Sequence, residues 1–196
     1  MNETVAPAIR ITDEKLLSDN WYILKRYTFD YQQKNGEWIT QQREAYDRGN
    51  GATVLLYNPE ADTVILTRQF RLPTYVNGNP TGMLIETCAG LLDNDHPDYA
   101  IRREMEEETG YQITDVQKVL EAYMSPGSVT EKLFFYIAHY SANTARQGGG
   151  GVDEEEIEVL ELPLSQAMRM IQTGEIMDGK TIMLLYYLTI NQLNKK

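Results

Sequence analysis

Two runs rich in aromatic and β-branched residues lie near the amino terminus, at residues 21–32 and 38–49, and the dipeptide Asn35-Gly36 lies between them. Asn-Gly between two such runs predicts a tight β-hairpin, because both residues tolerate the left-handed backbone that the turn requires. Residues 1–20 are only weakly patterned. We therefore predict a small amino-terminal β unit, residues 1–45, ahead of a main domain at residues 46–196.

Farther along the chain, short apolar runs bounded by turn residues predict β-strands, and a run that alternates apolar and acidic residues predicts a half-buried strand. These strands are expected at residues 52–57, 63–68, 83–88, 112–123, 132–140 and 157–162. Amphipathic helices are expected at residues 165–173 and 180–193, and loops at 73–82, 124–131 and 141–155. The last loop holds four consecutive glycines, so we expect a flexible segment or a site loop, not a packed element. The mixture predicts an α/β fold in which a sheet packs between helices.

The composition narrows the class of protein. With 42% hydrophobic and 24% charged residues, a chain of 196 residues can bury a globular core, as one domain with a small addition. Its 29 acidic and 18 basic residues give a net charge of −11, which argues against nucleic acid or an anionic membrane as the main partner. Cys88 is the only cysteine and lies in an apolar run, which predicts a buried thiol and a reducing compartment. With no charged-then-apolar leader and no apolar run of about 18 residues, we expect a cytoplasmic location, away from membranes.

The most distinctive chemistry lies at residues 90–111, where four carboxylates fall within five positions. On a helix, residues three and four apart share a face, so Glu104, Glu107 and Glu108 project to one side, while Ile101 and Met105 can be buried. Like charges on one face repel unless a cation lies among them, and carboxylate oxygens suit Mg²⁺ or Mn²⁺. The alternative is a solvated acidic face.

The flanking residues predict where this helix begins and ends. Asp95 is the expected N-cap, with Pro97 and Asp98 in the first turn. Gly110 is the expected left-handed residue at the carboxyl end. The salt bridges expected four residues apart pair Asp98 with Arg102 and Arg103 with Glu107.

The order Arg-Glu-x-x-Glu-Glu-x-Gly at residues 103–110, after a predicted strand and the Ala89-Gly90 loop, resembles the signature of the Nudix hydrolase family. The interval from Gly90 to Arg103 is one residue shorter than in the commonest form, and His96 stands where the family usually has a glutamate. This departure concerns the start of the helix. The resemblance implies an α/β/α sandwich that uses a divalent metal to hydrolyse a pyrophosphate bond.

The resemblance also implies roles for single residues. The metal ligands would be Glu104, Glu108 and the backbone carbonyl of Ala89, with a glutamate from residues 153–156 as a further ligand or as the general base. Glu155 is the preferred candidate and Glu154 the next, while the alternative is a solvated acidic loop. The implied catalytic residues are Arg103, Glu107 and Glu155.

Several segments resemble the ADP-sugar branch of the family, and within it the bacterial GDP-mannose pyrophosphatases: residues 47–53, 86–95, 124–127, 149–152 and 158–163. That likeness implies a homodimer in which the amino-terminal β unit crosses to the partner subunit and makes the site composite. The implied substrate contacts are Trp21, Gln42, Arg43, Glu44, Arg71, Ala89, Gly90, Leu91, Glu108, Glu131, Glu154, Glu155 and Lys180. The alternatives are that Trp21 packs in the core of the β unit and that Glu131 is a surface carboxylate.

The expected function is Mg²⁺-dependent hydrolysis of a nucleoside diphosphate sugar, with GDP-mannose giving GMP and mannose 1-phosphate. ADP-ribose, giving AMP and ribose 5-phosphate, is the alternative within the same class. Two other classes remain open: a nucleotide-sugar sensor on a Nudix fold without turnover, and an acidic interaction module. The intact Glu104, Glu107 and Glu108 argue against the sensor, because a sensor need not keep all three.

Overall fold

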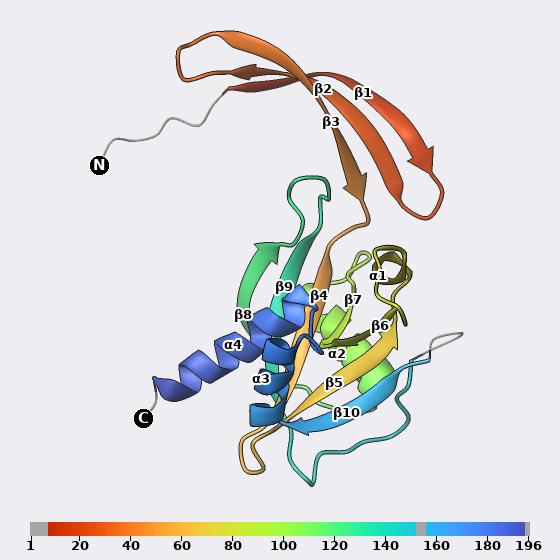
Figure 1. The fold of residues 1–196 in the computed structure, drawn as a ribbon, viewed down its shortest axis with the longest axis vertical. Helices are drawn as coiled ribbons and strands as arrows, with labels where there is room; N and C mark the ends of the chain where they lie inside the picture. Colours follow the sequence, from red (N-terminus) through yellow and green to blue (C-terminus); the bar gives the residue numbers. More distant parts are fainter. Residues whose placement is uncertain (1–7, 152–155, 195–196) are drawn as a thin grey trace. The chain divides into compact units, whose positions relative to one another are not determined.

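The structure, a computed structural model, describes residues 8–151 and 156–194 (Figure 1). Its contacts divide the chain into two compact units. The first unit holds the amino-terminal strands together with the loop 125–131, and the second holds residues 50–124 and the chain from residue 132 onward.

The amino-terminal unit is a three-stranded antiparallel sheet in the order β1-β2-β3. Its strands are β1 (Ile9–Asp19), β2 (Ile23–Gln32) and β3 (Trp38–Asp47). The predicted hairpin at Asn35-Gly36 is confirmed, with Gly36 at φ 87° between β2 and β3. Strand β1 was not predicted. Its pairing with β2 shifts register twice, between Ile11 and Asp13 and between Leu16 and Ser18, and such bulges break the alternation that marks a strand.

The loop 125–131 joins this unit through the end of β3. The backbone N–H of Tyr46 donates to Ser128 (2.8 Å), and the N–H of Thr130 donates back to Tyr46 (3.1 Å). The Thr130 hydroxyl adds a hydrogen bond to Asp47 at 3.0 Å. A segment that follows β8 in sequence therefore packs with the amino-terminal sheet, which local patterning could not reveal.

The second unit is built on a seven-stranded sheet in the order β10-β5-β4-β9-β8, with β6 paired to β5 and β7 paired to β4. β4 and β9 are parallel neighbours, whereas the other pairs are antiparallel. The strands are β4 (Gly51–Asn58), β5 (Thr63–Phe70), β6 (Met83–Glu86), β7 (Cys88–Leu91), β8 (Val116–Tyr123), β9 (Lys132–His139) and β10 (Glu158–Pro163).

The single strand predicted at residues 83–88 is two strands. The chain pairs with β5 up to Glu86, and from Cys88 it pairs with β4. Thr87 lies at the crossing, where its N–H donates to the Thr181 hydroxyl (2.7 Å) and its own hydroxyl lies 2.8 Å from that of Thr53. Ala89 and Gly90, expected in a loop, therefore belong to β7.

Helices cover both faces of this sheet, as Figure 1 shows with α2 on one side and α3 and α4 on the other. Adjacent strand residues point to opposite faces, so Leu55 and Leu66 pack with Leu184 of α4, while Val54 and Ile65 pack with Met105 of α2. The predicted α/β/α sandwich is confirmed. The helices are α1 (Leu72–Val76), α2 (Pro97–Thr109), α3 (Leu164–Thr173) and α4 (Gly179–Leu193).

One helix lies in a stretch that was predicted to be a loop. The short helix α1 overlaps this stretch, residues 73–82, with its Pro73 in the first turn, where proline's missing N–H costs nothing. Within residues 8–151 and 156–194, no helix is long and apolar enough to cross a membrane.

Candidate functional site

Helix α2 begins one residue later than predicted. The N-cap is His96, not Asp95, and its ring nitrogen Nδ1 accepts the backbone N–H of Asp98 at 3.4 Å. Pro97 fixes this start, because proline suits the first helical position and holds the residue before it in an extended conformation. His96 has φ −66° and ψ 139°, as this rule requires. The histidine found in place of the family's usual glutamate therefore caps the helix.

The predicted salt bridges along α2 are replaced by other contacts. The Asp98 carboxylate accepts the hydroxyl of Tyr136 on β9 at 2.5 Å, which ties the helix to the sheet. Arg103 lies with Nη2 3.3 Å from the carboxylate of Glu104 and 3.9 Å from that of Asp95. Arg103 is thus placed beside one of the two candidate metal-binding carboxylates and not beside Glu107.

The carboxyl end of α2 is covered by the glycine-rich stretch. Gly110 adopts the predicted left-handed conformation at φ 75°. The N–H of Gly150 donates to the carbonyl of Glu108 (2.8 Å), and that of Gly151 donates to Glu107 (3.2 Å). A Cβ on Gly149 would lie 2.7 Å from a backbone atom of Thr109, so only glycine allows this approach. The expected flexible or site loop is, over residues 148–151, a packed cap on carbonyls that a helix end leaves without partners.

The acidic run follows this cap directly. Residues 152–155, which include the candidates Glu154 and Glu155, lie outside the described residues, so their roles remain predictions.

Glu108 is a buried carboxylate of the site with a raised pKa. It is 5% exposed, and its Oε2 has no hydrogen-bond partner among the described residues. Burial raises the pKa of its carboxyl to about 7, with Glu104 and Glu86 adding to the rise and the Cys88 thiol and Arg71 opposing it. The sequence predicted an acidic face on this helix. In the structure, Glu108 of that face is buried.

Glu104 lies on the same side of α2, one turn earlier. Its side chain packs so closely over Gly90 of β7 that a Cβ at Gly90 would overlap the carboxylate. Both acidic side chains therefore face β7, where Cys88 adjoins Glu108 and Ala89 lies between Cys88 and Gly90. Of the three carboxylates predicted to share a face, Glu104 and Glu108 form a close pair, and Glu107 is half-buried beside them.

The donors present fit a divalent cation that accepts few protein ligands. Among the described residues, no three His, Cys, Asp or Glu side chains form a ready cluster for a metal. A buried carboxylate oxygen without a partner, next to a second carboxylate, is nevertheless an arrangement that a cation would stabilise. Mg²⁺ and Mn²⁺ suit such a site, because Mg²⁺ commonly uses one or two carboxylates and completes its shell with water and substrate phosphates.

Two predicted substrate cations lie together on the same unit. Arg71, between β5 and α1, and Lys180, in the first turn of α4, both form ion pairs with Glu86 at the end of β6. Glu86 was not among the predicted site residues. A carboxylate at the end of an apolar run was the available signal, because an acidic residue that is fully buried is almost always paired. Leu91, also predicted to contact substrate, is half-buried in β7 opposite Gly51.

The remaining predicted contacts belong to the amino-terminal unit. Trp21 is 84% exposed, so it is not a core residue of the sheet, and its ring meets that of Tyr22 edge-to-face. The other three strand residues are exposed, whereas the loop carboxylate Glu131 is partly buried, and all four have local contacts. Gln42 donates to Thr28, Arg43 donates to the carbonyl of Gln42, Glu44 lies opposite Arg26, and Glu131 lies 3.6 Å from Arg48.

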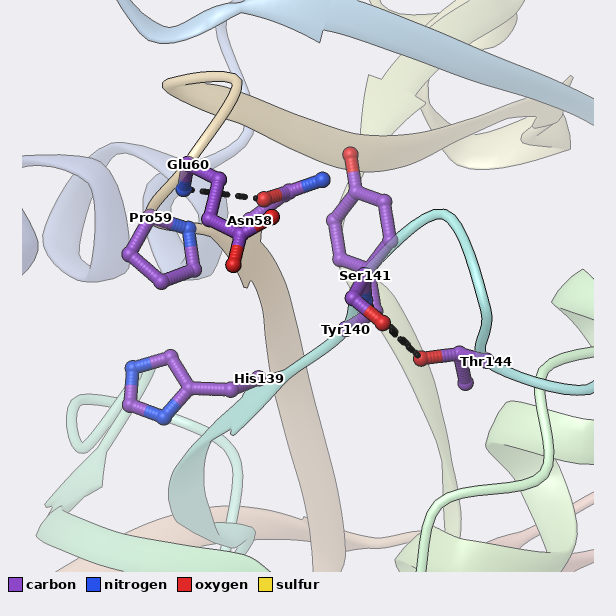
Figure 2. Close-up of a pocket in the computed structure, with 7 residues that line it drawn as sticks. All are labelled: Asn58, Pro59, Glu60, His139, Tyr140, Ser141 and Thr144. Atoms are coloured by element: carbon purple, nitrogen blue, oxygen red, sulfur yellow. Dashed lines mark hydrogen bonds between the residues drawn. The ribbon is translucent and has the colours of Figure 1, made fainter.

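A separate hollow lies at the other end of β4 from β7 (Figure 2). It is formed by the turn after β4 and the chain at the end of β9. Figure 2 shows that the backbone N–H of Glu60 donates to the Asn58 side chain and that the hydroxyls of Ser141 and Thr144 form a hydrogen bond. Among the described residues that line it, Glu60 is the single carboxylate, so these residues offer no second acidic group for a metal. Its lining residues are Asn58, Pro59, Glu60, His139, Tyr140, Ser141 and Thr144.

Comparison with known proteins assigns the chain. The model of the NUDIX domain matches residues 47–184, and that of the GDP-mannose pyrophosphatase NudK N-terminal domain matches residues 8–46. The chain belongs to the Nudix family. The predicted resemblance is confirmed, and with it the enzyme class, a Nudix pyrophosphohydrolase.

The chain is also similar to curated Nudix relatives and to a solved structure. It is 59% identical over 185 residues to a GDP-mannose pyrophosphatase of Citrobacter koseri, and 58% identical to that of Escherichia coli O157:H7. Both alignments cover 94% of this chain and 97% of the relative. A crystal structure of an ADP compounds hydrolase superposes with a TM-score of 0.75 at 16% identity, covering 100% of this chain and 98% of that one, and so supports the fold.

Proposed function

We propose that this Nudix enzyme hydrolyses the pyrophosphate bond of a nucleoside diphosphate sugar, with GDP-mannose as the preferred substrate and GMP and mannose 1-phosphate as products. The observation that carries the reaction type is the buried, unpartnered carboxylate of Glu108 beside Glu104 on the Nudix helix. The choice of sugar nucleotide is supported by relatives of 58–59% identity, named GDP-mannose pyrophosphatases, that match both the amino-terminal unit and the Nudix domain.

Mg²⁺, or Mn²⁺ in its place, would be held by Glu104, Glu108 and the backbone carbonyl of Ala89. When bound, the metal supplies charge neutralisation at the pyrophosphate and lowers the pKa of an attacking water. Arg103, 3.3 Å from Glu104, keeps that carboxylate in place. Glu155 is proposed as a further ligand and as the base that takes the proton of the water.

The groups that bind substrate phosphates would be Arg71 and Lys180, because a planar guanidinium and an ammonium match phosphate oxygens. The backbone of Gly90 and Leu91 lies next to Ala89 on β7 and would line the same wall. Glu108 and Glu154 would complete the contacts from this domain.

The homodimer is supported by the amino-terminal sheet itself. In the described residues 8–49 no side chain is fully buried, and Ile9, Ile11 and Leu16 are each more than half exposed. A three-stranded sheet needs a covered apolar face to be stable, so a second copy of the chain is the proposed cover. Trp21, Gln42, Arg43 and Glu44 would then reach the nucleotide bound by the partner subunit. Glu131, like Arg71 and Leu91, would contact the nucleotide bound by its own subunit.

A substrate panel with purified protein tests this proposal. GDP-mannose, ADP-ribose, ADP-glucose and free nucleotides would be incubated with Mg²⁺, and the phosphomonoesters released would be measured. We expect GDP-mannose to turn over fastest, chelation to abolish turnover, and Glu108→Gln to lose at least about a hundredfold in kcat, as removal of a transition-state charge partner does. Faster turnover of ADP-ribose would keep the chemistry and change the substrate. No turnover of any compound would favour a nucleotide-sugar sensor.

The proposed setting is the cytoplasm. A net charge of −11 gives no basis for binding nucleic acid, and the buried Cys88 thiol suits a reducing compartment.

A further inference from the structure

Glu86 is a buried carboxylate that receives three charge-assisted hydrogen bonds. It is 1% exposed. Arg71 donates from Nε to Oε1 at 2.8 Å and from Nη2 to Oε2 at 3.2 Å, and Lys180 donates from Nζ to Oε2 at 2.5 Å. Burial raises the pKa of the Glu86 carboxyl, but Lys180 and Arg71 outweigh burial, and the pKa lies below its ordinary value. Glu86 therefore remains charged at neutral pH.

The three partners come from distant parts of the chain. Arg71 precedes α1, Glu86 ends β6, and Lys180 lies 94 residues later in α4. Asp178, the N-cap of α4, holds the ammonium of Lys180 from a second direction at 3.1 Å. Without Glu86, nothing in these contacts would bring the guanidinium and the ammonium to one point.

This cluster borders the metal-binding carboxylates. Arg71 and Glu108 are close enough for each charge to shift the pKa of the other group. A guanidinium has five N–H donors, of which Glu86 takes two, and an ammonium has three, of which Glu86 and Asp178 take two. Both cations thus keep donors for an anionic ligand beside Glu108.

We propose that Glu86 is a positioning residue, which fixes Arg71 and Lys180 as a paired cationic wall that receives the phosphates of the substrate. This inference rests on the proposed function, since it takes a pyrophosphate as the ligand. Glu86 itself touches no phosphate, because a carboxylate repels one.

Whether Glu86→Gln weakens or tightens substrate binding distinguishes a positioning role from a purely electrostatic one. Glu86→Gln keeps the shape of the side chain but removes the charge and replaces one acceptor with a donor that faces the cations. If Glu86 acts only as a charge near the phosphates, its removal relieves repulsion and tightens binding. If it positions the cations, its removal lets both side chains move, and binding weakens.

The test compares Glu86→Gln, Arg71→Ala, the double variant and Glu161→Gln. Glu161 is a control in another part of the unit, where its carboxylate accepts hydrogen bonds from Tyr140 (2.9 Å) and Thr63 (3.1 Å). We expect Glu86→Gln to raise KM for GDP-mannose about tenfold with a smaller change in kcat, the scale on which residues that orient ligands act. The double variant should be little worse than Arg71→Ala alone, because both changes remove one function. Glu161→Gln should lower the Tm and leave KM unchanged.

A binding measurement keeps this inference separate from the proposed function. If wild-type protein hydrolyses no nucleotide sugar, the proposed function fails, and the same variants are then compared by calorimetric titration with inorganic pyrophosphate. Weaker pyrophosphate binding by Glu86→Gln still supports the positioning role. An unchanged or lower KM together with unchanged or tighter pyrophosphate binding in Glu86→Gln would overturn it, as would fully additive effects in the double variant.

Discussion

At the residue scale, the burial of Glu108 ties the stability of the fold to the protonation of one carboxyl group. The folded protein holds its carboxyl at a pKa of about 7, above the ordinary 4.5, chiefly because the group is buried. A proton on Glu108 therefore stabilises the folded state. That contribution is complete below pH 4.5 and is lost as the pH rises through 7.

This predicts a pH dependence of the metal-free protein. In the presence of a chelator, the free energy of unfolding of the wild type should fall between pH 5 and pH 8 by roughly 2–3 kcal/mol more than that of Glu108→Gln. Urea unfolding of both proteins at the two pH values measures the difference. Added Mn²⁺ should restore wild-type stability at pH 8 and have little effect on Glu108→Gln. If the stability of the two proteins changed with pH in the same way, the pKa of Glu108 would not be raised by folding.

Gly90 makes a second prediction at this scale. The three atoms nearest to a methyl group there all belong to the Glu104 side chain, whose end can move at little cost to the fold. Gly90→Ala should therefore keep a Tm near that of the wild type while metal affinity falls on the order of tenfold, because Glu104 is displaced. Titration with Mn²⁺ measures this. Gly127→Ala, where a Cβ meets nothing within 4 Å, is the control and should bind metal as the wild type does.

At the scale of elements, helix α2 and the glycine cap form one assembly. The cap supplies N–H groups to carbonyls that the last turn of α2 cannot pair internally, and it brings the chain to residue 151 beside the Glu107 carbonyl. The described chain thus reaches residue 151 next to the helix that carries Glu104 and Glu108, and residues 152–155 lie outside the described residues.

The cap predicts unequal costs for two neighbouring substitutions. Gly148 and Gly149 both have positive φ, 75° and 87°, but a Cβ on Gly148 meets nothing within 4 Å, whereas one on Gly149 meets the backbone of Thr109. Gly148→Ala should cost about 1 kcal/mol of stability through backbone strain alone. Gly149→Ala should cost at least about 2 kcal/mol more, because backbone must move. Denaturant unfolding compares them, and equal losses would show that the cap does not depend on this close approach.

At the scale of the whole molecule, a composite site makes a prediction about mixed dimers. Arg43→Ala and Glu108→Gln would each be inactive or strongly impaired as homodimers. If Arg43 serves the site of the partner subunit, a heterodimer of the two variants carries one site with both defects and one intact site. Heterodimers isolated by two different tags should then show about half of wild-type activity. Activity no higher than that of the parent variants would show that each site is built from one chain.

Much of the fold followed from local patterning. The Asn35-Gly36 hairpin, the four-residue spacing of Glu104 and Glu108 and the left-handed Gly110 depend on neighbouring residues alone, and each is found in the structure. Strand β1 escaped prediction because two bulges interrupt its alternation, and the cap of α2 shifted to His96 because Pro97 governs the residue before it.

Sequence by itself thus determined most of the strands, the acidic helix and the family to which its motif belongs, because these depend on spacing and backbone preference over a few residues. Tertiary structure decided which of those residues are buried and which meet. Three features bring together segments that lie far apart in the chain. The chain changes its partner strand at Thr87, the glycines pack on α2, and Glu86 joins Arg71 to Lys180. Such contacts are set by how the layers pack, and no local pattern contains them.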